Sequence, residues 1–171
     1  MLDAAQQSLP KVLVSSCLLG QPVRYDGGHK RADNAVLQDW LARGQVVAVC
    51  PEMAGGLPTP RLAAEIVGTG GGAQVLAGAA RVQDSAGVDV TTAFVRGAQQ
   101  ALQLVQQHGI RVAVLKESSP SCGSQQIYDG QFAGRTRAGE GVTSALLRQA
   151  GVAVFNEQQW AAAAQYLAAK F

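Results

Sequence analysis

Three cysteines, Cys17, Cys50 and Cys122, are the residues of this sequence best able to carry out chemistry. Each comes after a short apolar run that predicts a buried strand, and these runs are Lys11–Ser16, Gln45–Val49 and Arg111–Leu115. Open parallel sheets bind ligands beyond the carboxyl ends of their strands. We therefore expect the three thiols to meet at one edge of a sheet, although they lie 33 and 72 residues apart in the chain.

Thiolates are soft ligands, and three of them favour zinc or an iron–sulfur cluster. A structural zinc ion normally takes a fourth ligand, often from a Cys-x-x-Cys pair, and the sequence has no such pair. His29 is near Cys17 and is a candidate fourth ligand, whereas His108 ends a predicted helix, where the helix dipole favours a solvated histidine. A 4Fe–4S cluster with three protein ligands leaves one iron open, which is typical of a reactive site.

The loops that carry the cysteines also hold polar residues suited to catalysis and substrate binding. Glu52 lies two residues beyond Cys50 and is a candidate acid or base, although a loop glutamate is often only solvated. Arg24 and Lys116 are candidates for binding a phosphate, although either is equally explained as a solvated surface charge. The expected substrate-binding residues are Ser16, Arg24, Tyr25, Asp26, Gly28, His29 and Lys116. Asp26-Gly27 and Asp129-Gly130 are also ordinary turn signals.

Helical patterns alternate with the apolar runs and must position these loops. The predicted helices are Ala32–Arg43, Thr92–His108, Gly141–Ala150 and Glu157–Lys170, the last with Asn156 as its N-cap, and Val152–Phe155 is a fourth strand. This alternation predicts a three-layer α/β fold: a mainly parallel sheet of about four strands, with helices on both faces. The glycine-rich residues 62–90 interrupt it and predict a small β-hairpin excursion. Length predicts a single domain over residues 1–171, with residues 1–10 as a loose leader.

The composition indicates which kinds of partner and which cellular compartment to expect. The formal net charge is +2, from 14 basic and 12 acidic residues, which argues against a nucleic-acid-binding surface. The first ten residues lack the basic and apolar regions of a signal peptide, and we find no stretch that predicts a membrane span. An odd number of cysteines argues against a disulfide framework. We expect a cytoplasmic protein that binds a small molecule, without an obligate protein partner.

Motifs that span residues 11–157 resemble a bacterial family long labelled a domain of unknown function, whose characterised members are thiouracil desulfidases. The motifs are Cys17-Leu-Leu-Gly20, Arg24-Tyr25-Asp26-Gly27, Cys50-Pro51-Glu52, Gly55-Gly56-Leu57, Pro60-Arg61, Ser119-Pro120-Ser121-Cys122-Gly123 and residues 139–143. They occur in the family's order with all three cysteines in place. The glycine-rich stretch over residues 66–90 matches none of them.

The resemblance implies a 4Fe–4S cluster held by Cys17, Cys50 and Cys122, with a fourth iron that takes the sulfur of a thiolated uracil. The implied reaction is hydrolytic: a thiocarbonyl becomes a carbonyl and hydrogen sulfide is released, with no net redox change. Glu52 would assist by taking a proton from the attacking water, and either Ser119 or Ser121 would orient the ring or relay a proton. The implied substrate is a small thiolated uracil base or nucleotide rather than a nucleic acid.

Two other hypotheses use the same residues. The first is a module that binds zinc or a cluster and senses metal or redox state without catalysis. The second is a hydrolase with a cysteine nucleophile, which would need a Cys–His pair, and only His29 offers one. Iron content and turnover of a thiolated pyrimidine separate these hypotheses.

Overall fold

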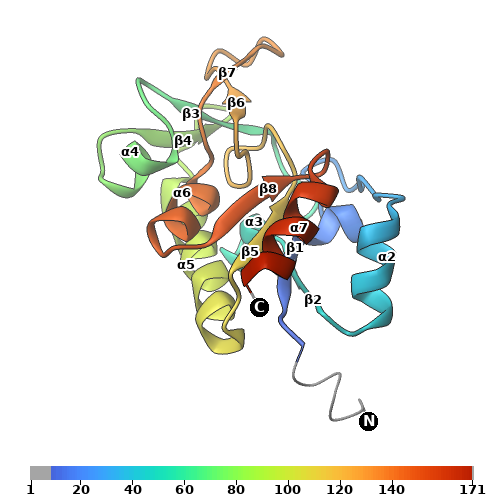
Figure 1. The fold of residues 1–171 in the computed structure, drawn as a ribbon. Coiled ribbons are helices and arrows are strands. Elements are labelled where there is room, and N and C mark those ends of the chain that lie inside the picture. The colour runs from blue at the N-terminus through green and yellow to red at the C-terminus, as the bar shows by residue number, and fades with distance from the viewer. Residues whose placement is uncertain (1–8, 171) are drawn as a thin grey trace.

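The computed structural model describes residues 9–170, and a four-stranded sheet forms its centre. The strands are β1 (Val12–Ser15), β2 (Val46–Val49), β5 (Val112–Leu115) and β8 (Ala153–Asn156). They lie in the order β2-β1-β5-β8, and all three neighbouring pairs are parallel (Figure 1). The predicted parallel sheet of four strands is confirmed, with β8 one residue later than expected.

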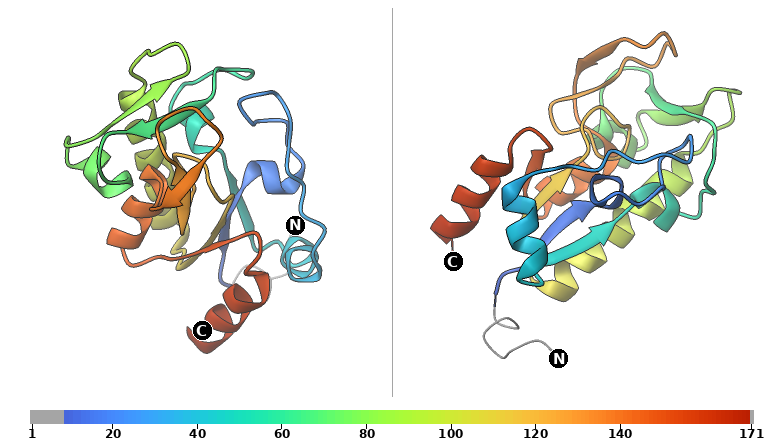
Figure 2. Two further views of the ribbon diagram at one scale, coloured as in Figure 1. Left: turned by 90° about the horizontal axis from the view of Figure 1, so that it is seen from above. Right: turned by 90° about the vertical axis from the view of Figure 1, so that its right-hand side faces the viewer.

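Helices cover both faces of this sheet, as the apolar strands predict (Figure 2). Val12 and Val14 of β1 belong to a core cluster with two helices, α2 (Ala35–Ala42) and α7 (Trp160–Lys170). Leu13, which points to the opposite face, belongs to the cluster of α5 (Thr91–His108) and α6 (Val142–Gln149). The result is a three-layer α/β fold.

The ends of most helices follow their sequence signals. Asn34 caps α2 by accepting a hydrogen bond from the amide of Val36 at 2.8 Å, and Gly109 ends α5 with a φ of +62°. The exception is Asn156, which is the last residue of β8 rather than the N-cap of α7. Asn156 pairs with Leu115 in the sheet, so the chain makes a turn before α7 begins at Trp160.

The excursion between the second and third strands contains the expected hairpin and one element that was not expected. β3 (Ala64–Val67) and β4 (Arg81–Asp84) pair antiparallel. Between them, α4 (Gly72–Leu76) makes Val75 and Leu76 helical, which corrects the prediction that they lie in the hairpin. Val75 is buried in a third core cluster with Ile66 and Phe94, and this tertiary contact overrides the glycine-rich sequence.

Four further short elements lie near the carboxyl edge of the sheet. They are the 3-10 turn η1 (Ser16–Leu19), helix α3 (Pro51–Ala54) and the strands β6 (Gln126–Tyr128) and β7 (Thr136–Ala138), which form a second antiparallel hairpin. The helices within residues 9–170 are all too short or too polar to cross a membrane. Residues 1–8 of the expected leader lie outside the described part of the chain.

Candidate functional site

A cavity of about 760 Å³ opens at the carboxyl ends of β1, β2 and β5. Cys17, Cys50 and Cys122 all line it, as expected from their positions after three neighbouring strands. Glu52, Ser119 and Ser121 line the same cavity. The structure therefore brings together the three cysteines, Glu52 and both candidate serines, whereas His29, the candidate fourth ligand, is not part of the cavity wall.

Cys17 lies in η1, directly after β1, and its backbone organises the loop that follows. The carbonyl of Cys17 accepts hydrogen bonds from the amide of Gly20 at 3.2 Å and from that of Lys30 at 2.9 Å. Gly20 adopts a φ of +89°, a conformation that glycine enters without steric cost. The loop from Gly20 to Lys30 therefore folds back over Cys17.

Cys50 is the N-cap residue of α3, with Pro51 in the first helical position. Gly55 and Gly97 allow α3 to lie directly against α5. A Cβ on Gly97 would come within 1.9 Å of the carbonyl oxygen of Pro51, and one on Gly55 within 2.0 Å of the carbonyl oxygen of Ala93. These close contacts fix α3, and with it Cys50 and Glu52, at the cavity.

Cys122 is held by the loop that leaves β5 and by the start of α6. Its amide donates to Ser119 Oγ at 2.8 Å, and its carbonyl accepts from Ser144 Oγ at 2.9 Å. Its sulfur receives hydrogen bonds from Ser121 Oγ at 3.5 Å and Ser15 Oγ at 3.8 Å. A Cβ on Gly141 would come within 2.4 Å of the backbone of Ser121, so α6 can start this close to Cys122 only with glycine there.

Burial raises the pKa values of all three thiols. Burial raises the pKa of Cys17 to about 11, the charge of Cys50 adds to this, and Lys116 and Arg24 oppose it. Burial also raises the pKa of Cys122 to about 12, against the hydrogen bond from Ser121, and raises the pKa of Cys50. All three thiols are weak acids in the free protein, and a metal centre would have to displace their protons on binding.

The donor set fits a metal cluster. Three soft sulfur atoms from three separate strand ends surround one cavity. Within residues 9–170, no three His, Cys, Asp or Glu side chains are grouped so that they could hold a single metal ion. The three thiols line one cavity, so they could hold a metal cluster there.

Glu52 forms an ion pair with Arg61, a residue that the sequence analysis quoted in a motif but did not assign to the site. The Arg61 side chain is only 6% exposed, and it also donates to the carbonyl oxygens of Pro58 at 3.1 Å and Val23 at 3.0 Å. Arg61 contacts Oε2 of Glu52, whereas Oε1 has no hydrogen-bond partner among the described residues. A buried arginine that is itself held by two backbone carbonyls thus fixes one carboxylate oxygen and leaves the other available. The sequence does not predict this ion pair, because a separation of nine residues does not by itself bring Arg61 and Glu52 into contact.

The two serines differ in their surroundings. Ser121 is buried and donates its hydroxyl proton toward the sulfur of Cys122. Ser119 is partly exposed, its Oγ accepts from the Cys122 amide, and it lies 3.3 Å from the Oγ of Ser121. Because the single Ser121 proton points at sulfur, the Ser119 hydroxyl is the donor in this pair, and a substrate that accepts its proton would replace Ser121 as the partner.

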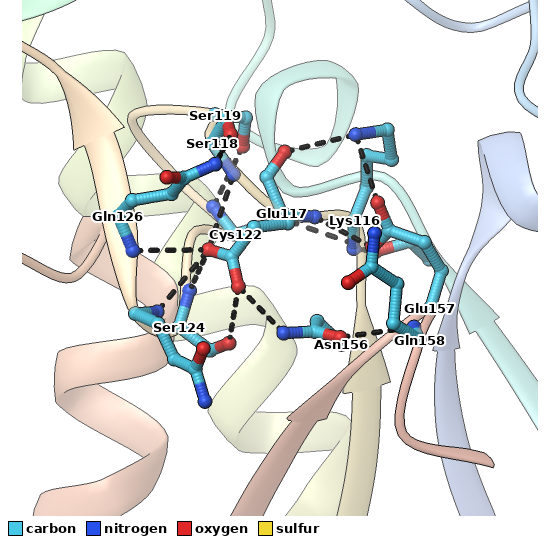
Figure 3. A network of polar contacts seen from close by, with 12 residues as sticks. Lys116, Glu117, Ser118, Ser119, Cys122, Ser124, Gln126, Asn156, Glu157 and Gln158 are labelled. Carbon is cyan, nitrogen blue, oxygen red and sulfur yellow. Dashed lines mark hydrogen bonds and ion pairs between the residues drawn. The ribbon is translucent and has the colours of Figure 1, made fainter. Parts of the chain in front are cut away.

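Glu117 ties the Cys122 loop to the sheet, and the sequence analysis did not assign it a role (Figure 3). Its Oε1 accepts from the backbone amides of Ser124 at 2.7 Å, Gln125 at 3.1 Å and Gln126 at 3.2 Å. Its Oε2 accepts from Ser124 Oγ at 2.9 Å and Asn156 Nδ2 at 2.7 Å. One carboxylate therefore joins the end of β5, the loop and the end of β8.

The expected substrate-binding residues divide into two groups. Ser16, Arg24, Tyr25 and Lys116 line the cavity. Lys116 is engaged there, because its Nζ pairs with Glu157 at 3.0 Å and donates to the Glu117 carbonyl at 3.0 Å. Asp26, Gly28 and His29 are not part of the cavity wall and form a turn in the loop after η1. His29 is exposed, and its Nδ1 accepts from the Arg31 amide rather than pairing with a cysteine.

Three comparisons with known proteins each found a match over most of the chain. The sequence model of the 2-thiouracil desulfurase family matches residues 12–159. YbbK, an uncharacterised protein of Bacillus subtilis strain 168, is 43% identical over 148 residues, which cover 86% of this chain and 96% of YbbK. The solved structure of the 4Fe-4S-dependent thiouracil desulfidase TudS is 50% identical, with a TM-score of 0.85, and the match covers 93% of this chain and 98% of that one.

Proposed function

The chain belongs to the 2-thiouracil desulfurase family, and on this premise we propose that it is a 4Fe–4S-dependent desulfidase of thiolated uracil compounds. The proposed reaction adds water across the carbon–sulfur bond: the thiocarbonyl and one water molecule become a carbonyl and hydrogen sulfide. The oxidation state of the carbon does not change, so neither oxidant nor reductant is consumed.

One observation supports this proposal most strongly: three thiols from three strand ends line one cavity together with a carboxylate and two serines. Cys17, Cys50 and Cys122 would hold the cluster. When bound through three thiolates, a 4Fe–4S cluster supplies an open iron, a Lewis acid suited to a soft thiocarbonyl sulfur.

Glu52 is the proposed base. Its Oε2 is held by Arg61, and its Oε1 is free among the described residues to accept a proton from the attacking water. Since Arg61 is itself fixed by the carbonyls of Pro58 and Val23, the carboxylate keeps its orientation while it exchanges a proton. Arg61 is accordingly a positioning residue rather than a catalytic one.

Ser119 is the proposed hydrogen-bond donor to the substrate. Its hydroxyl accepts from the amide of Cys122, which orients it, and its proton, which faces Ser121 Oγ at 3.3 Å in the free protein, would turn to the substrate. Ser121 is directed at the sulfur of Cys122, and we assign it to support of that ligand.

Arg24 is better suited than Lys116 to bind a substrate phosphate. Lys116 is neutralised by Glu157 at 3.0 Å, whereas the contact of Arg24 with the exposed Asp26 is looser, at 3.7 Å. Lys30 lines the same cavity and adds a second cation. A thiolated uracil nucleotide would thus place its phosphate near the loop that follows η1.

The test is to purify the protein anaerobically, measure iron and acid-labile sulfide, and follow sulfide release from 2-thiouracil and 4-thiouridine monophosphate. We expect about four iron atoms per chain, as the proposed cluster requires, and release of sulfide with formation of the oxo product. A protein that binds iron but turns over none of these compounds would instead be a sensor module. A protein that binds zinc and no iron would contradict the cofactor assignment.

A further inference from the structure

Exposed aromatic side chains gather at the mouth of the cavity. Within residues 9–170, the exposed large hydrophobic side chains are Tyr25, Leu41, Met53, Leu62, Val88, Tyr128, Phe132 and Tyr166. Four of these eight line the cavity, and three of the four are aromatic: Tyr25, Tyr128 and Phe132. Apolar side chains concentrated in this way mark a binding surface, because exposing them to water is otherwise unfavourable.

Phe132 is the least expected of the three. Its backbone φ is +55°, in the left-handed region that bulky residues rarely enter. Its side chain is 38% exposed, so the ring is not required to fill the hydrophobic core. Unfavourable backbone conformations that are held in place by their surroundings cluster at ligand-binding sites.

Glu65 holds Phe132 in this conformation. Glu65 lies in β3, is only 7% exposed, and lines the same cavity. Its Oε1 accepts hydrogen bonds from the amide of Gly130 at 2.9 Å and from that of Phe132 at 3.2 Å. A buried carboxylate from one hairpin therefore fixes the turn of the other hairpin, between β6 and β7.

The turn also presses directly against β3. A Cβ on Gly130 would come within 2.6 Å of the carbonyl oxygen of Ile66, so the backbone at Gly130 approaches β3 as closely as glycine permits. The turn that carries the Phe132 ring is thus fixed by two kinds of contact with β3, a carboxylate that binds its amides and a close approach of the two backbones.

We propose that Phe132 is a substrate-binding residue, which stacks on the pyrimidine ring of the substrate, and that Glu65 is the residue that positions it. This inference rests on the proposed function, which identifies the substrate ring as a pyrimidine. A planar aromatic side chain binds the face of a nucleobase whatever the substituents at its edge. Arg24 and Lys30 line the same cavity, so a nucleotide meets an aromatic ring for its base and cations for its phosphate.

The test uses the cluster-loaded protein under anaerobic conditions, with isothermal titration calorimetry of two unreactive probes, uridine 5′-monophosphate and ribose 5-phosphate. The variant is Phe132→Asn, because asparagine tolerates a positive φ and removes the ring. It should bind uridine monophosphate about 5- to 150-fold more weakly than wild type, the range for loss of one base–aromatic stack, and should bind ribose 5-phosphate unchanged. Phe132→Tyr keeps a ring and should bind both probes as wild type does.

Val88→Asn is the matched control, since Val88 is exposed but outside the cavity wall. It should leave the binding of both probes unchanged. Unchanged binding of uridine monophosphate by Phe132→Asn would overturn the inference. Equal losses for the two probes, or no binding of uridine monophosphate by wild type, would overturn it as well.

The role of Glu65 is tested through Phe132. Glu65→Gln replaces a charged acceptor with a weaker one and should weaken binding of uridine monophosphate about two- to fivefold. Combined with Phe132→Asn, it should cause no further loss, because a residue that acts only through the ring has no effect once the ring is gone. Additive losses, or no loss in the single variant, would refute the positioning role. A wild type that binds uridine monophosphate through Phe132 but turns over no thiouracil compound would refute the proposed function alone.

Discussion

At the scale of single residues, the three thiols are held in different ways. Cys122 is fixed through its amide, its carbonyl and two hydroxyls directed at its sulfur, whereas Cys50 is partly exposed and its thiol contacts the carbonyl of Val23, at 3.8 Å. Each thiol nevertheless comes from a different strand end, and none can be replaced by another, because the sequence has no fourth cysteine.

We therefore predict that Cys17→Ser, Cys50→Ser and Cys122→Ser each lose the intact cluster and all desulfidase activity. A serine hydroxyl is a hard donor and a poor substitute for a thiolate on iron. Iron and sulfide analysis with the visible absorption spectrum measures the cluster. Ser85→Ala, which alters the cavity wall at a position with no contact to a thiol, serves as the control. A serine variant that kept full iron content and full turnover would remove its residue from the ligand set.

Glu52 is predicted to act in the chemical step. Glu52→Gln keeps the shape of the side chain but removes the base, so kcat should fall by about 10²-fold or more while the cluster remains. Glu140→Gln is the matched control, since Glu140 pairs with Arg148 at 2.6 Å and does not line the cavity. Turnover near that of wild type, with an intact cluster, would reduce Glu52 to a partner of Arg61.

At the scale of elements, Glu117 decides how the Cys122 loop attaches to the sheet. Burial raises the pKa of Glu117, but the amides of Gln125, Ser124 and Gln126 and the Ser124 hydroxyl outweigh it and lower the pKa from 4.5 to about 2. A carboxyl whose pKa is lower in the folded state stabilises that state when ionised. This contribution is complete above about pH 4.5 and is lost as the pH falls toward 2.

Wild type should therefore be more stable than Glu117→Gln at pH 7, by on the order of 1–2 kcal/mol once solvent screening of a partly exposed group is allowed for. The difference should shrink between pH 4.5 and pH 2. Urea unfolding measures this difference in the free energy of unfolding. The cluster-free proteins are used because acid also displaces metal from thiolates. Asp39→Asn, which breaks an exposed ion pair with Arg43, should show little effect at either pH. A constant difference across this range would show that Glu117 acts through its shape alone.

The sequence predicts the long-range architecture better than the local detail. Four apolar runs and four amphipathic helices are readable because burial imposes their periodicity, and the meeting of the three cysteines follows from parallel strands sharing one edge. The family resemblance drawn from the cysteine motifs is confirmed by the match over residues 12–159.

The short elements could not be predicted, because tertiary contacts decide them. α4 forms where Gly72 lies so close to α6 that a Cβ would come within 2.1 Å of the Gly141 carbonyl oxygen, and no periodic signal encodes such a contact. The pairing of Arg61 with Glu52 depends on how residues 56–61 turn back toward Val23. The attachment of the Phe132 turn to Glu65 joins two hairpins through residues that are 65 or more positions apart in the chain.

At the scale of the whole molecule, charge and cavity shape together favour a small substrate. The net charge is only +2 and several cations are already paired with carboxylates, so the electrostatic attraction on which affinity for RNA depends is expected to be weak. The cavity of about 760 Å³ lies within the size range of small-molecule sites, and Glu52, Ser119 and Ser121 line it together with the thiols. Affinity is thus expected to come from the cavity rather than from the outer surface.

The corresponding prediction compares 4-thiouracil, 4-thiouridine, 4-thiouridine 5′-monophosphate and thiolated tRNA under identical anaerobic conditions. The monophosphate should be the best of the small compounds, through a lower KM with little change in kcat, because a remote phosphate binds equally in the ground state and the transition state. Arg24→Ala should raise the KM for the monophosphate and leave that for the free base unchanged, since only the former meets the guanidinium. Lys116→Ala is the informative comparison, because its ammonium already pairs with Glu157 and should contribute little to phosphate binding. If thiolated tRNA were turned over far faster than every small compound, the substrate class would be wrong while the thiol site and its chemistry could still stand.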